Sequence, residues 1–190
     1  MSLNSIDYIF LFGDYFVSIL LLVYFIRAYQ KKNISNYFIY AFFAGCLIGS
    51  TWELTFHFLG DAFSHSIKIW PWGLDGLPKK LSHSIWDGGL FMVGIWLCIK
   101  FLPGPHFTKF NTRELLIMEA WGIFQELLVE YLFNGRVWLY EELSWNPVII
   151  PPLPGSATTV GYTFIPQAIW VVAPLVFYVL LIKLKNIYKE

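Results

Sequence analysis

Acidic and histidine side chains recur at helical spacing inside apolar stretches of this chain. Three pairs stand four residues apart, which places both members of each pair on one face of a helix: Glu53 and His57, His83 and Asp87, and Glu126 and Glu130. Carboxyl and imidazole groups are the usual general acids and bases of enzymes. A carboxyl group in apolar surroundings can also keep a proton that it later donates. The pattern therefore indicates acid–base chemistry or the binding of a charged ligand.

The composition places these groups in a membrane protein. Of the 190 residues, 57% are hydrophobic and only 14% are charged, against about 25% charged in ordinary soluble domains. A soluble protein of this composition would expose large apolar patches to water. The 13 basic and 13 acidic residues cancel, so no basic field exists to attract a nucleic acid. Two cysteines, Cys46 and Cys98, lie in apolar runs without metal or redox spacing.

Five segments are long and apolar enough to cross the bilayer, which takes roughly 20 residues in a helix. They are residues 8–29, 36–59, 82–102, 113–133 and 160–184. The first lacks the basic start and the cleavage site of a signal peptide, so we interpret it as a retained helix. The expected fold is an all-α, polytopic membrane protein with five transmembrane helices in a bundle, and residues 1–190 form a single transmembrane domain.

The basic residues predict the orientation, because cytosolic flanks are enriched in lysine and arginine. One side would carry nine of them: Arg27, Lys31, Lys32, Lys100, Lys109, Arg113, Lys183, Lys185 and Lys189. The other side would carry four: Lys68, Lys79, Lys80 and Arg136. This predicts an outside N-terminus and a cytosolic C-terminus. The outer loops, 60–81 and 134–159, are rich in tryptophan and proline, which predicts rigid segments against the bilayer.

In this topology most of the ionisable groups fall at one depth, in the outer half of the membrane. Glu53 lies in the last two turns of the second helix, Asp87 lies in the first two turns of the third, and Glu126 lies near the outer end of the fourth. Asp14 and Gln167 share that layer, whereas Glu119 lies nearer the middle. Buried ionisable groups in membranes are costly and usually functional, so we expect one polar pocket. For Asp14, His57, His83 and Glu130, a purely structural role near the interface is an equal alternative.

Aromatic side chains would line the same pocket. The candidates for contacting a substrate are Trp52, Trp86, Trp121, Gln167, Trp170 and Glu119. Taken singly, each ring is more typical of packing or of anchoring at the interface, but indole rings that lie together near acids can stabilise a positive charge through cation–π contacts. The sequence has no GxSxG, P-loop or dinucleotide-binding motif. His57, His83, Asp87 and a glutamate could bind one metal, but such spacing is common in helices.

Three stretches resemble the emopamil-binding protein family, the EXPERA-domain proteins, which include sterol Δ8–Δ7 isomerase and the sigma-2 receptor. They are CLIGSTWELTFHFL, the third segment up to WLCIKFL, and PQAIWVVAPLVF. By this resemblance Glu53 matches the acid of the second helix, Trp170 matches a fifth-helix tryptophan, and Gln167 replaces an asparagine. Where the family has a histidine before that acid, this chain has Gly49. The stretch from the first apolar segment through STWEL also resembles the start of the membrane terpene cyclases of fungal meroterpenoid pathways, which have seven helices.

The resemblance implies a cofactor-independent isomerase or cyclase that acts on a sterol- or terpenoid-like lipid through a carbocation. Glu53 and Asp87 would be the proton-transfer pair, which Glu126, His57 and His83 would assist or orient. The expected partners are a hydrophobic or lipid substrate and the membrane, with a homodimer left open and no nucleic acid. In a eukaryotic host the location would be the endoplasmic reticulum. The alternatives are a non-catalytic amphiphile-binding protein, a metal-dependent lipid hydrolase and a proton-coupled transporter.

Overall fold

The computed structural model describes residues 5–67 and 70–188. Two basic residues that contribute to the predicted orientation, Lys68 and Lys189, lie outside the described residues. The described chain is dominated by long helices, as the apolar segments predict.

Five long helices form in the order expected, and most of their bounds are close to the predictions. They are α1 (Ser5–Lys31), α2 (Asn36–Leu59), α3 (Leu77–Phe101), α4 (Thr112–Phe133) and α5 (Phe164–Ile187). The largest difference is at α3, which begins at Leu77 and not at residue 82. Pro78 stands in the first turn, where proline favours helix initiation because no helical N–H is needed there. Lys79 and Lys80 are therefore helical residues.

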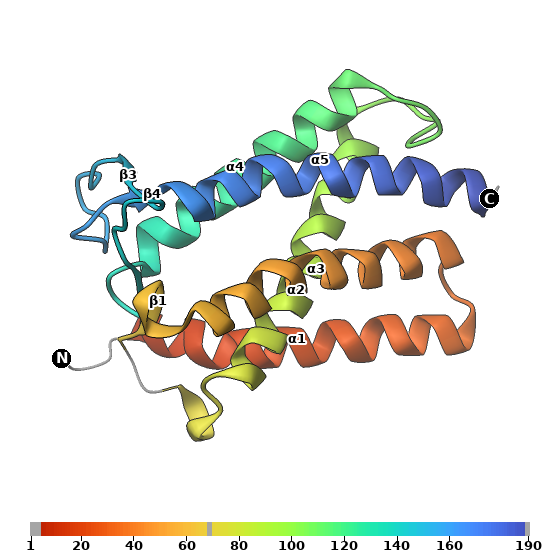
Figure 1. Cartoon of the computed structure of the whole chain (residues 1–190). Helices are drawn as coiled ribbons and strands as arrows, with labels where there is room; N and C mark the ends of the chain where they lie inside the picture. The colour runs from red at the N-terminus through yellow and green to blue at the C-terminus, as the bar shows by residue number, and fades with distance from the viewer. Residues whose placement is uncertain (1–4, 68–69, 189–190) are drawn as a thin grey trace.

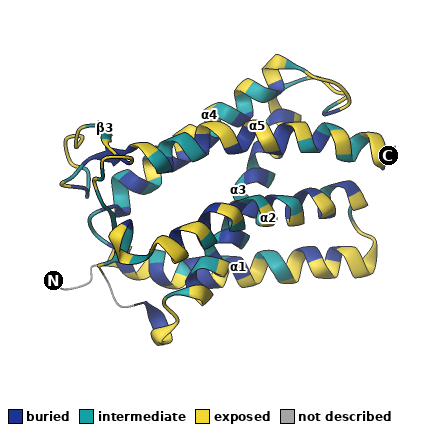
Figure 2. Ribbon diagram, viewed as in Figure 1, coloured by how far each residue is buried: buried dark blue, intermediate teal, exposed yellow. Residues whose placement is uncertain are grey.

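Helix α3 is the centre of the bundle. Helices α1, α2 and α4 all pack on it, and α5 closes the structure against α2 and α4. Successive helices run in alternate directions, so α2 and α4 end where α3 and α5 begin (Figure 1). Most of the exposed residues lie on the outward faces of the helices (Figure 2), where many are apolar, including Ile9, Phe16 and Leu47. Such faces suit contact with lipid tails.

Four helices, α1, α2, α3 and α5, are long and apolar enough to cross a membrane. Helix α4 does not meet this criterion because it carries Arg113, Glu114, Glu119, Glu126 and Glu130. It nevertheless runs the length of the bundle beside α5 (Figure 1). Its 22 residues span about 33 Å at 1.5 Å per residue. The membrane-protein class is thus supported, whereas the crossing by α4 stays a prediction.

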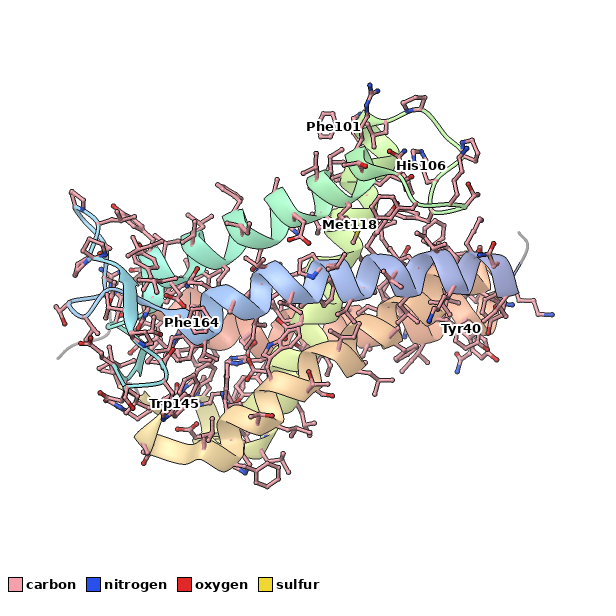
Figure 3. The ribbon with its side chains drawn as sticks, turned by 45° about the horizontal axis from the view of Figure 1, so that its top comes forward. Tyr40, Phe101, His106, Met118, Trp145 and Phe164 are labelled. Carbon is pink, nitrogen blue, oxygen red and sulfur yellow. The ribbon has the colours of Figure 1, made fainter. Side chains whose placement is uncertain are left out.

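The two long loops fold together at one end of the bundle, which we call the loop end. Strand β1 (Ser64–Ser66) pairs antiparallel with β2 (Trp138–Tyr140), and β3 (Val148–Ile150) pairs with β4 (Tyr162–Thr163). Two short 3-10 helices, η1 (Gly60–Ala62) and η2 (Pro71–Gly73), lie in the first loop. Because β1 and β2 come from different loops, both loops lie at the same end of the bundle. Figure 3 shows this end around Trp145 and Phe164, with Tyr40 and His106 toward the other end.

Glycines bring α2 and α3 into close contact. A Cβ atom at Gly45 would lie 3.1 Å from the Gly88 Cα, and one at Gly49 would lie 2.6 Å from an Asp87 carboxylate oxygen. Small residues allow helices in membranes to approach this closely. The packing brings Glu53 of α2 and Asp87 of α3 to the wall of one cavity.

Candidate functional site

A polar cavity of about 100 Å³ lies inside the bundle near the loop end. All five helices contribute to its wall, as do the loops at that end. Its lining includes Asp14, Trp52, Glu53, Phe56, Trp70, Lys79, Lys80, His83, Trp86, Asp87, Gln125, Glu126, Tyr140 and Trp170. The cavity therefore combines acids, bases and aromatic rings within a bundle that is apolar outside.

Among the acids that line the cavity, Glu53 has the most ion-pair partners. The Lys80 Nζ atom lies 3.0 Å from its Oε2 atom, and the His83 Nδ1 atom lies 3.5 Å from the same oxygen. Both carboxylate and ammonium are largely buried, with 10% and 12% of their side chains exposed. Buried charges need such partners, so Glu53 is suited to work as a carboxylate.

His83 connects Glu53 to a second acid. Its Nε2 atom lies 3.6 Å from the Asp14 Oδ2 atom of α1, and the indole of Trp70 packs edge-on against the ring at 5.4 Å. Helix α1 is held in register beside it, because the Ser18 Oγ donates to the Ser82 carbonyl at 2.9 Å. His83 thus bridges α1 and α2 at the cavity.

Asp87 has a different environment. It is 7% exposed, and its Oδ2 atom makes no hydrogen bond among the described residues. Trp52 lies within hydrogen-bonding reach of the carboxyl group, and Gly49 leaves the space that it occupies. No lysine, arginine or histidine of the described chain lies within ion-pair distance of Asp87. A carboxyl group buried without a cation is suited to carry a proton.

Glu126 and Glu130 form a second acidic pair, on α4. Both are buried, with 8% and 0% exposure, and their carboxyl groups lie within hydrogen-bonding reach of each other. The Asn134 Nδ2 donates to the Glu130 Oε2 at 3.3 Å, and Gln167 of α5 lies beside Glu130. Only Glu126 lines the cavity.

Aromatic rings surround these acids. Trp52 and Trp170 meet at 5.7 Å between ring centroids, and Phe91 packs against Trp170 at 5.5 Å. Tyr140 of β2 lines the wall from the loop side. Burial raises the pKa of the Tyr140 hydroxyl well above its ordinary value, and the nearby Glu126 and Glu53 carboxylates raise it further. Tyr140 is therefore a neutral hydrogen-bond donor at physiological pH.

The cavity brings together most of the predicted site residues. Seven of them line it: Trp52, Glu53, His83, Trp86, Asp87, Glu126 and Trp170. Four do not: His57, Glu119, Trp121 and Gln167. His57 is exposed and lines a neighbouring groove, and Glu119 is half-buried on α4. The Trp121 indole N–H donates to the Leu90 carbonyl at 2.9 Å, which is a bond between α4 and α3.

Lys80 and Tyr140 are site residues that the sequence pattern does not reveal. With a third helix that begins at residue 82, Lys80 is only a flanking charge. The spacing of Lys80 and His83, one helical turn apart, is a signal that an earlier helix start would have exposed. Tyr140 reaches the cavity through the β1–β2 pairing, and no local pattern predicts that pairing.

An open groove of about 640 Å³ adjoins the cavity at the loop end. It shares Phe56, Ser64, Lys79 and Lys80 with the cavity wall. Lys79 stands between them, with its Nζ atom 2.6 Å from both Asp75 Oδ1 and Ser66 Oγ. Partial burial alone would raise the pKa of the Asp75 carboxyl, but Lys79 and the Gly76 N–H hold it below its ordinary value. These bonds tie the first loop to α3.

In residues 5–67 and 70–188, no cluster of three or more histidine, cysteine or acidic groups has the arrangement of a metal site. His57, one of the possible ligands, lines the groove, whereas Asp87 lines the cavity. The described residues therefore do not assemble the ligand set that the sequence allowed.

Comparisons with protein families, with curated proteins and with solved structures give no significant match to this chain. The class of the protein, a helical membrane protein with a polar internal cavity, follows from its composition and geometry alone.

Proposed function

We propose that this protein is an intramembrane isomerase or cyclase that acts on a sterol- or terpenoid-like lipid by acid–base catalysis. The observation that carries the proposal is the contrast between two carboxyl groups on one cavity wall. Glu53 is paired with Lys80 and His83, whereas no lysine, arginine or histidine of the described residues lies within ion-pair distance of Asp87. Pairs of acids in such different environments divide the roles of base and acid.

In this mechanism Asp87 donates a proton to a carbon–carbon double bond or an epoxide of the substrate. The resulting carbocation lies among the faces of Trp52 and Trp170, and cation–π attraction is worth about 2 kcal/mol or more where water is excluded. Glu53 then removes a proton from a neighbouring carbon, with Lys80 and His83 holding its carboxylate in place. The proton count balances, so the reaction needs no oxidant or reductant.

The size of the cavity sets how a substrate would bind. Pockets that enclose whole drug-sized ligands measure about 300–1,000 Å³, whereas this cavity has about 100 Å³. The cavity would hold the reacting end of a lipid, and the rest of the molecule would extend along the apolar helices. The resemblance to the emopamil-binding protein family supports this substrate class. The chain departs from that family at Gly49, where the family has a histidine; here the Asp87 carboxyl group packs against Gly49.

The proposed membrane arrangement has five spans, with α4 crossing beside α5. Its acids face inward: Glu126 and Glu130 are buried in the bundle, so lipid does not have to solvate them. The loop end would lie outside and the C-terminus in the cytosol, at the endoplasmic reticulum if the host is eukaryotic. The basic residues Lys79, Lys80 and Arg136 of the loop end face Asp75, Glu53 and Asp7, which fits a side with few free positive charges.

The first experiment extracts lipids from the purified protein and incubates them with it in deuterated water. The wild type is compared with Asp87→Asn and Glu53→Gln, which keep the shape of each side chain. We expect the wild type to convert a co-purified or added sterol or terpenoid and to incorporate deuterium from the solvent. Both variants should retain the lipid and lose at least about 100-fold in rate, the contribution typical of general acid–base groups.

Glu119→Gln is the matched control, because Glu119 is an acid of α4 that does not line the cavity. It should convert the lipid at the wild-type rate. A bound lipid that all four proteins leave unchanged would overturn the enzymatic proposal. Metal analysis of the same samples tests the hydrolase alternative, which requires one metal ion per chain.

A non-catalytic amphiphile-binding protein is the second candidate, and the charge of the cavity favours it. Asp14, Glu53, Asp87 and Glu126 line the wall, whereas Lys79 and Lys80 are already paired with carboxylates. A buried excess of acid suits a cationic amine. A lipophilic amine that binds the wild type tightly but Asp87→Asn weakly, with no lipid conversion by either, would establish this function.

A further inference from the structure

The buried acids of α4 extend beyond the cavity wall. Glu126 lines the cavity, and Glu130 lies one helical turn further toward the loop end, with none of its surface exposed. The acid–base scheme uses neither residue as the donor or the base. A completely buried glutamate with no assigned role needs an explanation, because an unpaired buried charge is among the most costly features of a protein.

The groups around this pair are all acidic or neutral. Asp87 of α3 and Glu53 of α2 face Glu126, Tyr140 of β2 faces both members, and Tyr162 of β4 faces Glu130. Among the described residues, no lysine, arginine or histidine lies within ion-pair distance of either glutamate. Two adjacent carboxylates in this setting cannot both be charged.

Hydrogen bonding leads to the same conclusion by a separate route. The Glu130 carboxyl group is completely buried, and the Asn134 and Gln167 amides and the Glu126 carboxyl group lie within hydrogen-bonding reach of it. Buried polar atoms almost always have a partner. The Glu126 carboxyl group lies within hydrogen-bonding reach of Glu130, so a proton on one carboxyl group supplies the donor that the other needs.

We propose that Glu126 and Glu130 share one proton and that Glu130 passes protons between the cavity and the loop end. On the loop side, the buried Tyr162 hydroxyl has no hydrogen-bond partner in the described chain and lies near Glu130. It is the next group that can accept and donate a proton. Glu130 is thus a relay residue behind the cavity and does not touch the substrate.

The relay has a clear use, which rests on the proposed function. In each cycle Asp87 gives a proton to one carbon and Glu53 gains a proton from another. One proton must therefore return to Asp87 before the next cycle. The pair faces both residues, so it can give its shared proton to Asp87 and take up the proton that Glu53 gained, which restores the Glu53 carboxylate. No co-reactant is needed.

Infrared spectroscopy of the protein in lipid nanodiscs tests this without any substrate. Protonated carboxyl groups give a resolved carbonyl band, and Glu126→Gln assigns the part that belongs to the pair. On titration from pH 4 to pH 9, the wild type should show two well-separated steps for the pair, as coupled sites do. In Glu130→Gln the remaining step of Glu126 should move to an intermediate pH. A step that stays at its wild-type position would overturn the shared proton.

Exchange kinetics test the passage of protons. After transfer into deuterated water, the acid band of Glu126 should shift at least about ten times more slowly in Glu130→Gln than in the wild type. Tyr162→Phe removes only a hydroxyl group, so it still tests the relay if Glu130→Gln fails to fold. It should slow exchange while leaving both titration steps in place. Equal exchange rates in all three proteins would overturn the relay.

Glu119→Gln serves as the control, since Glu119 is half-buried on the same helix. This variant should lose the titration step of Glu119 and leave both steps of the Glu126–Glu130 pair unchanged. The infrared measurements need no substrate, so their outcome does not depend on turnover. Two coupled titration steps in a protein that converts no lipid would support the shared proton and contradict the proposed function. A single uncoupled step in a protein with full turnover would support the proposed function and contradict the shared proton.

Discussion

At the scale of single residues, the ion pair between Lys80 and Glu53 is the contact with the largest consequence. Both side chains are mostly buried, and their charged atoms lie 3.0 Å apart. Replacement of Lys80 by Met leaves a buried carboxylate without its strongest partner. We expect a loss of about 3–5 kcal/mol in the free energy of unfolding, as for other broken buried pairs. Equilibrium unfolding in detergent would measure it.

The double variant Lys80→Met/Glu53→Gln is the informative control for that loss. Removal of both charges leaves no unpaired buried charge, so most of the lost stability should return. If the double variant is as unstable as the sum of the two single variants, the pair does not contribute as an ion pair. Activity should be lost in all three proteins, because Glu53→Gln removes the proposed base and Lys80→Met removes the cation that holds its carboxylate in place.

Asp75 predicts a pH dependence of stability at the loop end. Its pKa is held below the ordinary value because the opposing effects of Lys79 and the Gly76 N–H exceed that of partial burial. A lowered folded-state pKa stabilises the protein above the unfolded-state value of about 3.9, and this contribution is lost as the pH falls through the lowered pKa. The melting temperature of the wild type should therefore exceed that of Asp75→Asn at pH 6.

The two melting temperatures should converge as the pH is lowered below about 4. The side chain of Asp75 is 46% exposed, so solvent screening keeps the difference small. A difference that is constant between pH 6 and pH 3 would contradict a role for the Asp75 charge.

At the scale of helices, the contact between α2 and α3 sets the position of Asp87. Gly49→Ala would place a methyl group 2.6 Å from the Asp87 carboxylate oxygen and 2.7 Å from its Cβ atom. The helices must separate or Asp87 must move, at a cost of about 1–3 kcal/mol for overpacking. We expect both lower thermal stability and a loss of lipid conversion, measured on the same preparation.

Gly13→Ala provides the matched control for this contact. A Cβ atom at Gly13 of α1 meets nothing within 4 Å, and alanine favours a helix over glycine by about 1 kcal/mol. This variant should be as stable as the wild type or more so, with unchanged activity. If Gly49→Ala behaves in the same way, the close packing of Asp87 does not position it for function.

At the scale of the whole molecule, the arrangement of loops predicts which residues share a side of the membrane. Single cysteines at exposed positions can report this with a membrane-impermeant maleimide. Asp61→Cys and Ser144→Cys should react from the outside of intact cells, and Lys32→Cys and Lys109→Cys should react only after permeabilisation. Of the two native cysteines, Cys98 is buried and should stay unlabelled, and the half-buried Cys46 is replaced by alanine in every variant.

The pair Ser144 and Lys109 decides whether α4 crosses, since the two positions flank that helix. Labelling of both from the same side would show that α4 does not span the membrane. Labelling of every position on the side opposite to the predicted one would keep five spans and reverse the orientation.

The sequence by itself determined the class of the protein and the positions of its helices. A long apolar run can bury its surface in lipid and satisfy its backbone only as a helix, so α2 was predicted to the residue and α4 within one residue. The start of α3 was missed because Pro78, Lys79 and Lys80 read as a polar flank. The i, i+4 spacing also identified Glu53, His83, Asp87 and Glu126, since helical periodicity is local.

The tertiary structure alone decided which of these side chains meet and which partners they have. Helical spacing places His57 on a face but does not say what covers that face, and it lies in the groove outside the cavity. The approach of Lys80 to Glu53 and the return of Tyr140 through β2 join residues far apart in the chain. Such contacts depend on the packing of whole helices and loops. That packing separates the paired acid Glu53 from the unpaired acid Asp87, on which the proposed chemistry depends.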